Sequence, residues 1–276
     1  MTQTYYQLRA ELTSALAGFL DLEEAQAECS RWFEEGLGLP RSWMAAHGAE
    51  AVPPEVPREI DVWTDRRRKG EPWAYILGWS LFRGRRFKVT PDTLIPRPET
   101  ELLVEAALEV GQRLKVDRCV DVGTGSGIIA VSLALATDWK VAASDLSPGA
   151  LKVAEKNAEE LGAAIQFHRG SLLDPVPDPV GLVVANLPYV DPADQSGLQR
   201  ELSFEPSSAL FAPDRGLALS TALLAQAHTR KAPACLLEIG AGQGGELGRR
   251  AMEIGWRKVL IHQDLAGHDR ILVALA

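Results

Sequence analysis

The sequence predicts an α/β protein in which a small helical segment precedes a mostly parallel seven-stranded sheet with helices on both faces. Residues 1 to about 72 place apolar residues at helical spacing and show no strand-like alternation. From about residue 116 onward, short apolar runs alternate with stretches of helical length, which is typical of a parallel sheet covered by helices.

Length and composition fit this architecture. With 276 residues, 46% hydrophobic residues and a net charge of −8, the chain is long enough for one large domain and a small one. An acidic protein is a poor candidate for gripping nucleic acid, so we expect no direct nucleic-acid binding. No apolar run approaches the roughly 20 residues that span a bilayer, and the N-terminus lacks the blocks of a signal peptide. We therefore expect a cytoplasmic protein that does not bind membranes.

The three cysteines, Cys29, Cys119 and Cys235, show neither metal-ligand spacing nor a disulfide framework. We expect buried thiols in a reducing compartment, and no metal. Two basic clusters, Arg66–Lys69 and Arg83–Lys88, fit a solvated helix end and an exposed hairpin. They also fit a docking surface for a partner that is acidic or bound to RNA, and the sequence leaves both interpretations open.

The N-terminal segment is predicted to be helical throughout. The first helix presents one apolar face, formed by Leu8, Leu12, Leu16, Phe19 and Leu20. A second helix contains Trp32–Leu37 and ends within Gly36–Pro40. Prolines within Pro53–Pro57 then interrupt the chain before a short helix over about Arg58–Lys69. We expect the tryptophans and leucines of this segment to form its core.

A hairpin and a stiff extended piece follow the helical segment. Trp79–Phe82 and Arg86–Val89 flank Arg83-Gly84-Arg85, which predicts a β-hairpin with glycine at the turn. Within Thr93–Glu101, two prolines separated by one residue predict an extended backbone. A helix is then expected over about Pro98–Leu114, with acidic residues near its positive end.

The remaining residues alternate between strands and helices. Strands are predicted at Cys119–Val122, Lys140–Ser144, Ile165–His168, Leu182–Ala185, Ala234–Ile239, Lys258–His262 and Arg270–Ala274. Helices are predicted near 127–137, 148–161 and 215–231. These seven strands would form one sheet.

The first of these strands runs into a glycine-rich turn, Asp121–Gly127. Glycine lets the backbone turn sharply and lets a ligand approach the bare main chain. The dinucleotide pattern Gly-x-Gly-x-x-Gly needs a glycine where this chain has Ile128. Asp121 adds a carboxylate that would disfavour a pyrophosphate but suits the amino group of a methionine moiety.

Two later strand ends strengthen this interpretation. Asp145 follows the loop by about twenty residues, at the position where ribose hydroxyls are usually bound. Gly170-Ser171-Leu172 follows the next strand, where an adenine would lie. Together these strand ends look like a site for S-adenosyl-L-methionine. Its expected contacts are Asp121, Gly123, Thr124, Gly125, Ser126, Gly127, Asp145, Ser171, Leu172 and Asn186.

A second glycine-rich segment, Glu238–Gly245, fits the dinucleotide pattern better than the first. Asp264 even follows at the expected spacing. Only about a dozen residues remain after it, too few for the rest of a nucleotide domain. We expect a tight turn on a late strand.

The segment Asn186-Leu187-Pro188-Tyr189 ends a buried strand and suggests the reaction. An amide or aromatic amino nitrogen is a poor nucleophile, and its hydrogens become more acidic as a methyl group arrives. Acceptors on those hydrogens therefore bind the transition state best. The Asn186 side-chain oxygen and the Leu187 carbonyl are the expected acceptors. Pro188 stiffens the turn, and Tyr189 offers a flat face for a planar amide or base.

The order of these motifs resembles the peptide chain release factor glutamine methyltransferases over essentially the full length. The most specific features are Ile95-Pro96-Arg97-Pro98-Glu99-Thr100-Glu101, Asp121–Gly127, Asn186–Tyr189, Glu238–Gly244 and Asp264–Arg270. The resemblance implies a Rossmann-like class I methyltransferase domain at 93–276, a β-hairpin linker at 73–92 and a helical substrate-docking domain at 1–72.

The resemblance also implies an activity. It is the methylation, from S-adenosyl-L-methionine, of the side-chain amide nitrogen (N5) of the glutamine in the Gly-Gly-Gln motif of class 1 release factors. Gly123–Gly127 would line the cofactor methionine and Asp145 its ribose. Asn186, Pro188 and Tyr189 would be catalytic, and Leu187, Arg97 and Glu99 would complete the acceptor side. A monomer is expected.

Departures and alternatives accompany the resemblance. Leu187 replaces the usual first proline of the motif, although a backbone carbonyl contact survives that change. Ser171 and Leu172 stand where an acid and an aromatic residue are common. The alternative function is an adenine-N6 nucleic-acid methyltransferase, because the same motif can hold an exocyclic amine. A scaffold role and a nicotinamide-dependent oxidoreductase explain the intact Asn186–Tyr189 motif less well.

Overall fold

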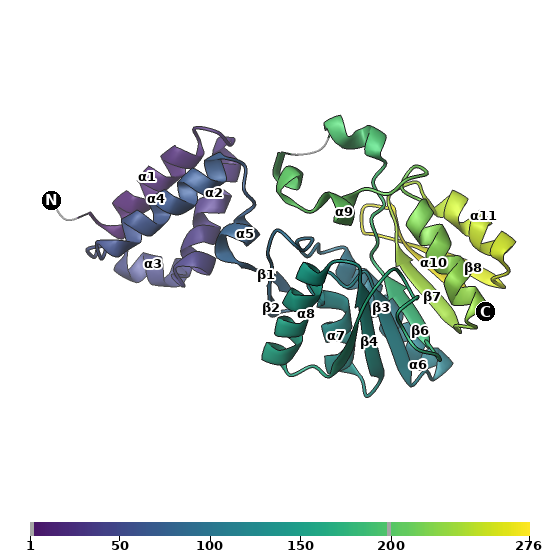
Figure 1. The fold of residues 1–276 in the computed structure, drawn as a ribbon. Coiled ribbons are helices and arrows are strands. Elements are labelled where there is room, and N and C mark those ends of the chain that lie inside the picture. Colours follow the sequence, from purple (N-terminus) through teal and green to yellow (C-terminus); the bar gives the residue numbers. More distant parts are fainter. Residues whose placement is uncertain (1–2, 198–199) are drawn as a thin grey trace. The chain divides into compact units, whose positions relative to one another are not determined.

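The computed structural model describes residues 3–197 and 200–276, which fall into two compact units, Met1–Leu77 and Gly78–Ala276 (Figure 1). The first unit is helical and the second is built on a sheet. No helix within the described residues has the length and apolar character needed to cross a membrane.

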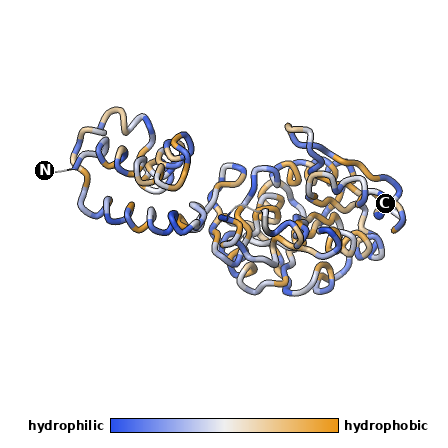
Figure 2. Tube along the Cα trace, turned by 90° about the horizontal axis from the view of Figure 1, so that it is seen from above, coloured by the Kyte–Doolittle hydropathy of each residue, from blue (hydrophilic) through white to orange (hydrophobic). Residues whose placement is uncertain are grey.

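The first unit is a bundle whose helices pack on one core. Its elements are α1 (Tyr5–Leu16), α2 (Leu22–Arg31), the π-helical turn η1 (Trp32–Gly36), α3 (Arg41–His47), α4 (Glu55–Arg68) and α5 (Trp73–Leu77). Hydrophobic and hydrophilic residues alternate along these helices in Figure 2. In the core, Trp32 stacks on Trp73 with ring centroids 4.6 Å apart. The predicted core of leucines and tryptophans is confirmed, as is the buried face at Leu8, Leu12 and Leu16.

Helix boundaries in this unit differ from the prediction for local reasons. Helix α4 begins at Glu55 rather than Arg58, because Pro54 is its N-cap and Pro57 lies in its first turn. A proline in the first turn loses no hydrogen bond, since the first N–H groups of a helix have no internal partner. The second helix, for which no starting residue was predicted, begins at Leu22, where the Asp21 side chain accepts a hydrogen bond from Glu24 N–H.

The basic cluster Arg66–Lys69 is not simply a solvated helix end. Arg67 is buried and pairs with Glu28, with 2.6 Å between Arg67 Nε and Glu28 Oε1. Arg66 pairs with Glu71 and Arg68 with Asp65. These ion pairs all lie within the helical unit. The arginines at the end of α4 are therefore bound to acidic side chains of the same unit.

In the second unit, the described residues include seven strands in one sheet, in the order β5-β4-β3-β6-β7-β9-β8. The strands are β3 (Arg118–Val122), β4 (Lys140–Asp145), β5 (Ile165–Arg169), β6 (Leu182–Ala185), β7 (Ala234–Glu238), β8 (Lys258–Gln263) and β9 (Asp269–Leu275). Strand β9 runs antiparallel to both neighbours, and β3 to β7 are parallel. The predicted mostly parallel seven-stranded sheet is therefore confirmed. The hairpin β1 (Trp79–Phe82) and β2 (Arg85–Lys88) precedes it, as predicted.

Helices cover both faces of the sheet (Figure 1). They are α6 (Thr100–Leu114), α7 (Ile128–Ala136), α8 (Pro148–Leu161), α10 (Ala218–Thr229) and α11 (Gly244–Ile254). Successive β6 residues point to opposite faces. Leu182 and Val184 pack in the cluster with α6, α7 and α8, whereas Val183 and Ala185 pack with α10 and α11. Burial on both faces explains why β6 is apolar throughout.

The sequence did not predict every element. Helix α11 begins at Gly244, within the second glycine-rich segment, where only a turn was expected. The helix contains three glycines, Gly244, Gly245 and Gly248. Because glycine has a weak helix propensity, the sequence does not indicate a helix here. The short helices η2 (Pro192–Gly197), η3 (Arg200–Phe204) and α9 (Ser207–Leu210) were also unpredicted.

The strand order fixes where a ligand can bind. Strand β3 lies between β4 and β6, so the order reverses at β3, and chain crossovers on its two sides go to opposite faces. Ligands in open α/β sheets bind at the carboxyl ends of the strands beside such a switch point. In register, Val122 of β3 lies beside Ala185 of β6, which places the glycine-rich loop next to Asn186.

Candidate active site

A cavity of about 270 Å³ lies at this edge of the sheet. Four strand ends contribute to its wall, namely 122–126 after β3, 145–147 after β4, 170–172 after β5 and 186–188 after β6. The extended segment 92–97 closes another side. Its position at the switch point and its mixed apolar and polar wall are those of a small-ligand site.

The glycine-rich loop is folded against β4 by main-chain hydrogen bonds. The N–H groups of Gly123 and Thr124 donate to the Ser144 carbonyl at 2.8 and 3.0 Å. Gly123 has φ +73°, and a Cβ there would lie 2.9 Å from Leu187 Cδ2. A side chain at Gly123 would thus push the cofactor loop away from the loop that carries Asn186.

Asp145 ties the loop to the start of α8. One carboxylate oxygen accepts from Gly125 N–H at 2.9 Å, and the other accepts from Ser147 N–H at 2.8 Å. The side chain lines the cavity and is half-buried. Because each carboxylate oxygen has a second lone pair, Asp145 retains the capacity to accept from a ligand hydroxyl.

Asp121 lies beneath the loop rather than in the cavity wall. Its Oδ2 accepts from Thr124 Oγ1 at 2.6 Å and from Ala130 N–H at 3.1 Å. Its Oδ1 is buried and has no hydrogen-bond partner among the described residues. Burial raises the pKa of Asp121 to about 7. Gly127, with φ +84°, is also absent from the described lining and packs against Ala154.

The predicted adenine contacts line the cavity. Ser171 and Leu172 both face it, and Leu172 adopts φ +47°. The Leu172 carbonyl accepts a hydrogen bond from Ser144 Oγ at 2.8 Å. The strand end that holds the glycine-rich loop therefore also holds this part of the wall.

At the carboxyl end of β6, the amide of Asn186 is oriented by a buried threonine. Asn186 Nδ2 donates to Thr100 Oγ1 at 3.1 Å, and Thr100 is almost completely buried. Asn186 Oδ1 accepts no hydrogen bond within the described residues, so it is available for a ligand donor. Thr100 was not predicted as a site residue, since nothing local to residue 100 indicates a partner 86 positions away.

Tyr189 is held at both ends. Its hydroxyl donates to Glu238 Oε1 at 3.4 Å, and its carbonyl accepts from Gln243 Nε2 at 2.9 Å. Burial, and then the neighbouring Glu238 carboxylate, raise the pKa of Tyr189 to about 12. Among the described residues of the motif, Asn186, Leu187 and Pro188 line the cavity and Tyr189 lies just beyond it.

Arg97 and Glu99 have different positions. Arg97 lines the cavity and pairs with Glu205, a buried carboxylate that also accepts from Ile95 N–H at 3.0 Å. Glu205 thereby holds the extended segment against the site, a role that no local pattern around residue 205 indicates. Glu99 is exposed at the N-cap of α6 and is not part of the described lining.

These features fit S-adenosylmethionine. The loop presents bare main chain to the cavity, an acid follows on the next strand, and a buried carboxylate oxygen without a partner lies beneath the loop. Within the described residues, the sheet has seven strands in the order given above, and the site lies at its switch point. This combination defines a class I S-adenosylmethionine-dependent methyltransferase.

Comparison with known proteins gives the family. A methyltransferase-domain model matches residues 119–203, and a PrmC N-terminal-domain model matches residues 7–78. The release factor glutamine methyltransferase of Bordetella pertussis is 41% identical over 243 residues, covering 86% of this chain and 90% of that protein. The protein of that name from Enterococcus faecalis is 36% identical over 271 residues, covering 96% and 98%. This chain belongs to the release factor glutamine methyltransferase family.

Solved structures agree on the fold. The hMettl16 catalytic domain in complex with a MAT2A 3′UTR hairpin matches with a TM-score of 0.59 at 14% identity, over 79% of this chain and 81% of that chain. The human methyltransferase 10 domain containing protein matches with a TM-score of 0.54 at 15% identity, over 70% and 88%. At such low identity the likeness concerns the fold alone, and it agrees with the predicted Rossmann-like α/β fold.

Proposed function

We propose that this enzyme transfers a methyl group from S-adenosylmethionine to the side-chain amide nitrogen (N5) of the glutamine in the Gly-Gly-Gln motif of class 1 release factors. The observation that carries the proposal is the fixed orientation of Asn186. Its Nδ2 donates to Thr100, and its Oδ1, which lies beside the cofactor loop, accepts no hydrogen bond from the residues that the structure describes. Relatives named for release factor glutamine supply the acceptor class.

The acceptor loop would act on the hydrogens of the substrate amide. As the nitrogen forms a new bond its lone pair leaves conjugation, and its N–H groups become stronger donors. Asn186 Oδ1 and the Leu187 carbonyl would accept these hydrogens and would therefore stabilise the transition state more than the ground state. Pro188 has no N–H and limits the backbone, which keeps the acceptors in position.

The remaining predicted residues divide between the two ligands. Gly123, Thr124, Gly125 and Ser126 would hold the methionine part of the cofactor, Asp145 its ribose, and Ser171 and Leu172 its adenine. Asp121 and Gly127 would support the loop from beneath. When bound, the cofactor supplies a methyl group attached to a sulfonium sulfur. Transfer is favourable because the sulfur leaves as a neutral thioether. Tyr189 lies beyond the cofactor wall, so its ring would contact the acceptor.

We propose a separate role for each domain. We place substrate docking in residues 1–72, a linker in 73–92 and catalysis in 93–276, although contacts within the helical unit extend to Leu77. The enzyme would act as a monomer in the cytoplasm without binding nucleic acid directly. Methylation of an adenine amine needs the same acceptors, but relatives of 36 to 43% identity favour the protein substrate.

Methyl transfer from labelled S-adenosylmethionine to a purified class 1 release factor tests the proposal. The controls are the same factor with Gln→Ala in its Gly-Gly-Gln motif, and duplex DNA. We expect label on the wild-type factor alone. Label on the altered factor would contradict the assigned position, and label on DNA would favour the adenine-N6 alternative.

A further inference from the structure

We infer that Gln243 and Glu238, in the second glycine-rich segment, are positioning residues that hold Tyr189 and hence the acceptor loop. The inference rests on the proposed function of Asn186–Tyr189. This segment resembles a nucleotide-binding turn in sequence, yet it does not line the described cavity. Its polar side chains point instead at the two ends of Tyr189.

Gln243 uses its amide to join three stretches of main chain. Its Oε1 accepts from Gly240 N–H at 2.8 Å, which fixes which way the amide faces. Its Nε2 then donates to the Tyr189 carbonyl at 2.9 Å and to the Arg215 carbonyl at 3.1 Å. One side chain therefore binds the turn after β7, the end of the acceptor loop and the segment before α10.

The packing around these contacts leaves no room for a side chain at two neighbouring glycines, Gly216 and Gly240. Gly216 has φ +80°, and a Cβ there would lie 1.9 Å from the Tyr189 carbonyl oxygen and 2.8 Å from Gln243 Nε2. At Gly240, a Cβ would lie 3.0 Å from Gln243 Oε1. Two glycines thus allow the close approach that brings the Gln243 amide to Tyr189.

Glu238 binds the side chain of Tyr189, whereas Gln243 binds its main chain. Glu238 Oε1 accepts from the Tyr189 hydroxyl, and the glutamate residue is 2% exposed. Burial raises the pKa of Glu238, and the nearby hydroxyls of Thr100 and Tyr189 offset part of that rise. Glu238 is therefore close to both Tyr189 and the threonine that orients Asn186, so one buried group lies behind both ends of the motif.

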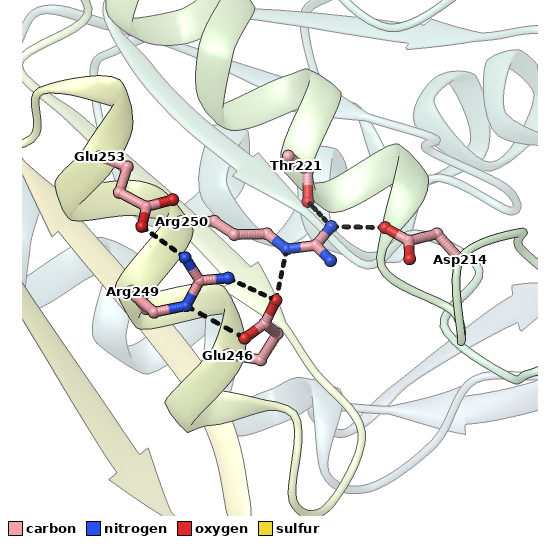
Figure 3. Close-up of polar contacts among 6 residues, drawn as sticks. All are labelled: Asp214, Thr221, Glu246, Arg249, Arg250 and Glu253. Atoms are coloured by element: carbon pink, nitrogen blue, oxygen red, sulfur yellow. Dashed lines mark hydrogen bonds and ion pairs between the residues drawn. The ribbon is translucent and has the colours of Figure 1, made fainter.

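Helix α11 secures the third stretch from outside. Figure 3 shows Arg250 between Asp214 and Glu246, with a further hydrogen bond to Thr221 Oγ1 at 3.2 Å. Asp214 directly precedes Arg215, whose carbonyl accepts from Gln243. The stretch that carries the Arg215 carbonyl is therefore also held by the Arg250–Asp214 ion pair, and not by Gln243 alone.

Replacing Gln243 by glutamate tests the role with little change in shape. Gln243→Glu keeps an acceptor for Gly240 N–H but turns an oxygen toward two carbonyls. We expect kcat/KM for the release factor to fall by about 10- to 100-fold, as a displaced reacting group does. The dissociation constant for S-adenosylhomocysteine, measured by calorimetry, should stay within about twofold, because Gln243 is not among the described residues lining the cavity. Gln243→Ala, which lacks the repulsion, gives a second variant if the first folds poorly.

The matched control is Gln263→Glu. Gln263 lies on the exposed β8–β9 hairpin, where its Nε2 donates to Asp269 at 3.1 Å, and wild-type turnover is expected. Combining Gln243→Ala with Asn186→Ala adds a readout specific to positioning. If Gln243 acts through the acceptor loop, its effect should largely vanish once Asn186 is gone.

The outcomes separate the inference from the proposed function. Wild-type enzyme that does not label the release factor contradicts the proposed function, whatever Gln243 does. Wild-type activity with an unchanged Gln243→Glu variant overturns the inference alone. Equal losses of S-adenosylhomocysteine affinity and turnover would also overturn it, because they would indicate a general role in folding of the domain.

Discussion

The proposed cofactor side and the proposed acceptor side of the cavity are built in different ways. The cofactor side is made of main-chain groups and short-range contacts, such as the Asp145 carboxylate with the N–H groups of Gly125 and Ser147. The acceptor side depends on side chains that meet across the fold. Asn186 reaches Thr100 over 86 positions, and Arg97 reaches Glu205 over 108. The acceptor geometry is therefore a property of the whole domain.

This difference predicts that single substitutions can separate turnover from cofactor binding. Changes on the acceptor side should alter the rate of transfer with little effect on cofactor affinity. Changes on the cofactor side should lower affinity with little effect on the rate of transfer, except at Gly123, where the two loops are in contact and both quantities should fall.

Asn186→Ala should give the largest effect. It removes the acceptor Oδ1, and loss of one such preorganised group costs roughly 10²- to 10³-fold in kcat. S-adenosylhomocysteine should still bind with nearly wild-type affinity. Single-turnover transfer and calorimetry measure the two quantities. A large loss of affinity would break the comparison, since Asn186 would then serve the cofactor side.

Gly123→Ala should weaken both sides at once. Its φ of +73° is unfavourable for alanine, and the new Cβ would lie 2.9 Å from Leu187 Cδ2. Left-handed backbone and overpacking together cost about 2–4 kcal/mol, so we expect cofactor affinity to fall about tenfold or more and kcat to fall as well. Gly162→Ala is the matched control, because Gly162 has φ +72° with nothing within 4 Å of a Cβ. Equal effects at the two glycines would show that the contact with Leu187 is unimportant.

Thr100→Val should sharpen the comparison with a smaller effect. Valine keeps the buried shape but removes the oxygen that accepts from Asn186 Nδ2, so the asparagine amide loses its fixed orientation. Loss of one such hydrogen bond is worth roughly 1–2 kcal/mol, or about tenfold in kcat. Thr100→Ser keeps the oxygen and should restore most of the rate. Indistinguishable rates for the two variants would mean that Thr100 contributes shape alone.

The same contrast explains what the sequence could predict. Gly123–Gly127 and Asp145 were identifiable because strand, turn and helix start are adjacent in the chain, and their chemistry is local. Asn186–Tyr189 was identifiable as a motif, but its supports were not. Thr100, Glu205 and Gln243 are ordinary residues until the fold brings them to partners 54 to 108 positions away. The second glycine-rich segment forms a turn after β7, as predicted, but its contacts with Tyr189 could not be inferred from its own pattern.

The last prediction concerns stability rather than turnover, and it involves two buried acids, one on each side of the cavity. The pKa of Asp121 is raised from 3.8 to about 7 by burial. Between these values the unfolded chain releases a proton that the folded protein keeps. The contribution of Asp121 to the free energy of unfolding is therefore fully present below the unfolded pKa of 3.8, and it is lost as pH rises toward 7. The slope within this window is at most about 1.4 kcal/mol per pH unit.

Asp121→Asn should reduce this slope, measured as the free energy of unfolding in urea between pH 5 and 8. The cofactor carries an ammonium group, which would favour the ionised form of Asp121. Saturating S-adenosylhomocysteine should then move the sloping region of the wild-type curve to lower pH, and Asp121→Asn should lack that shift. Glu238→Gln, on the acceptor side, should also reduce the pH dependence but leave the ligand-induced shift intact. A wild-type curve that does not move with ligand would mean that Asp121 only anchors the loop through Thr124 and Ala130.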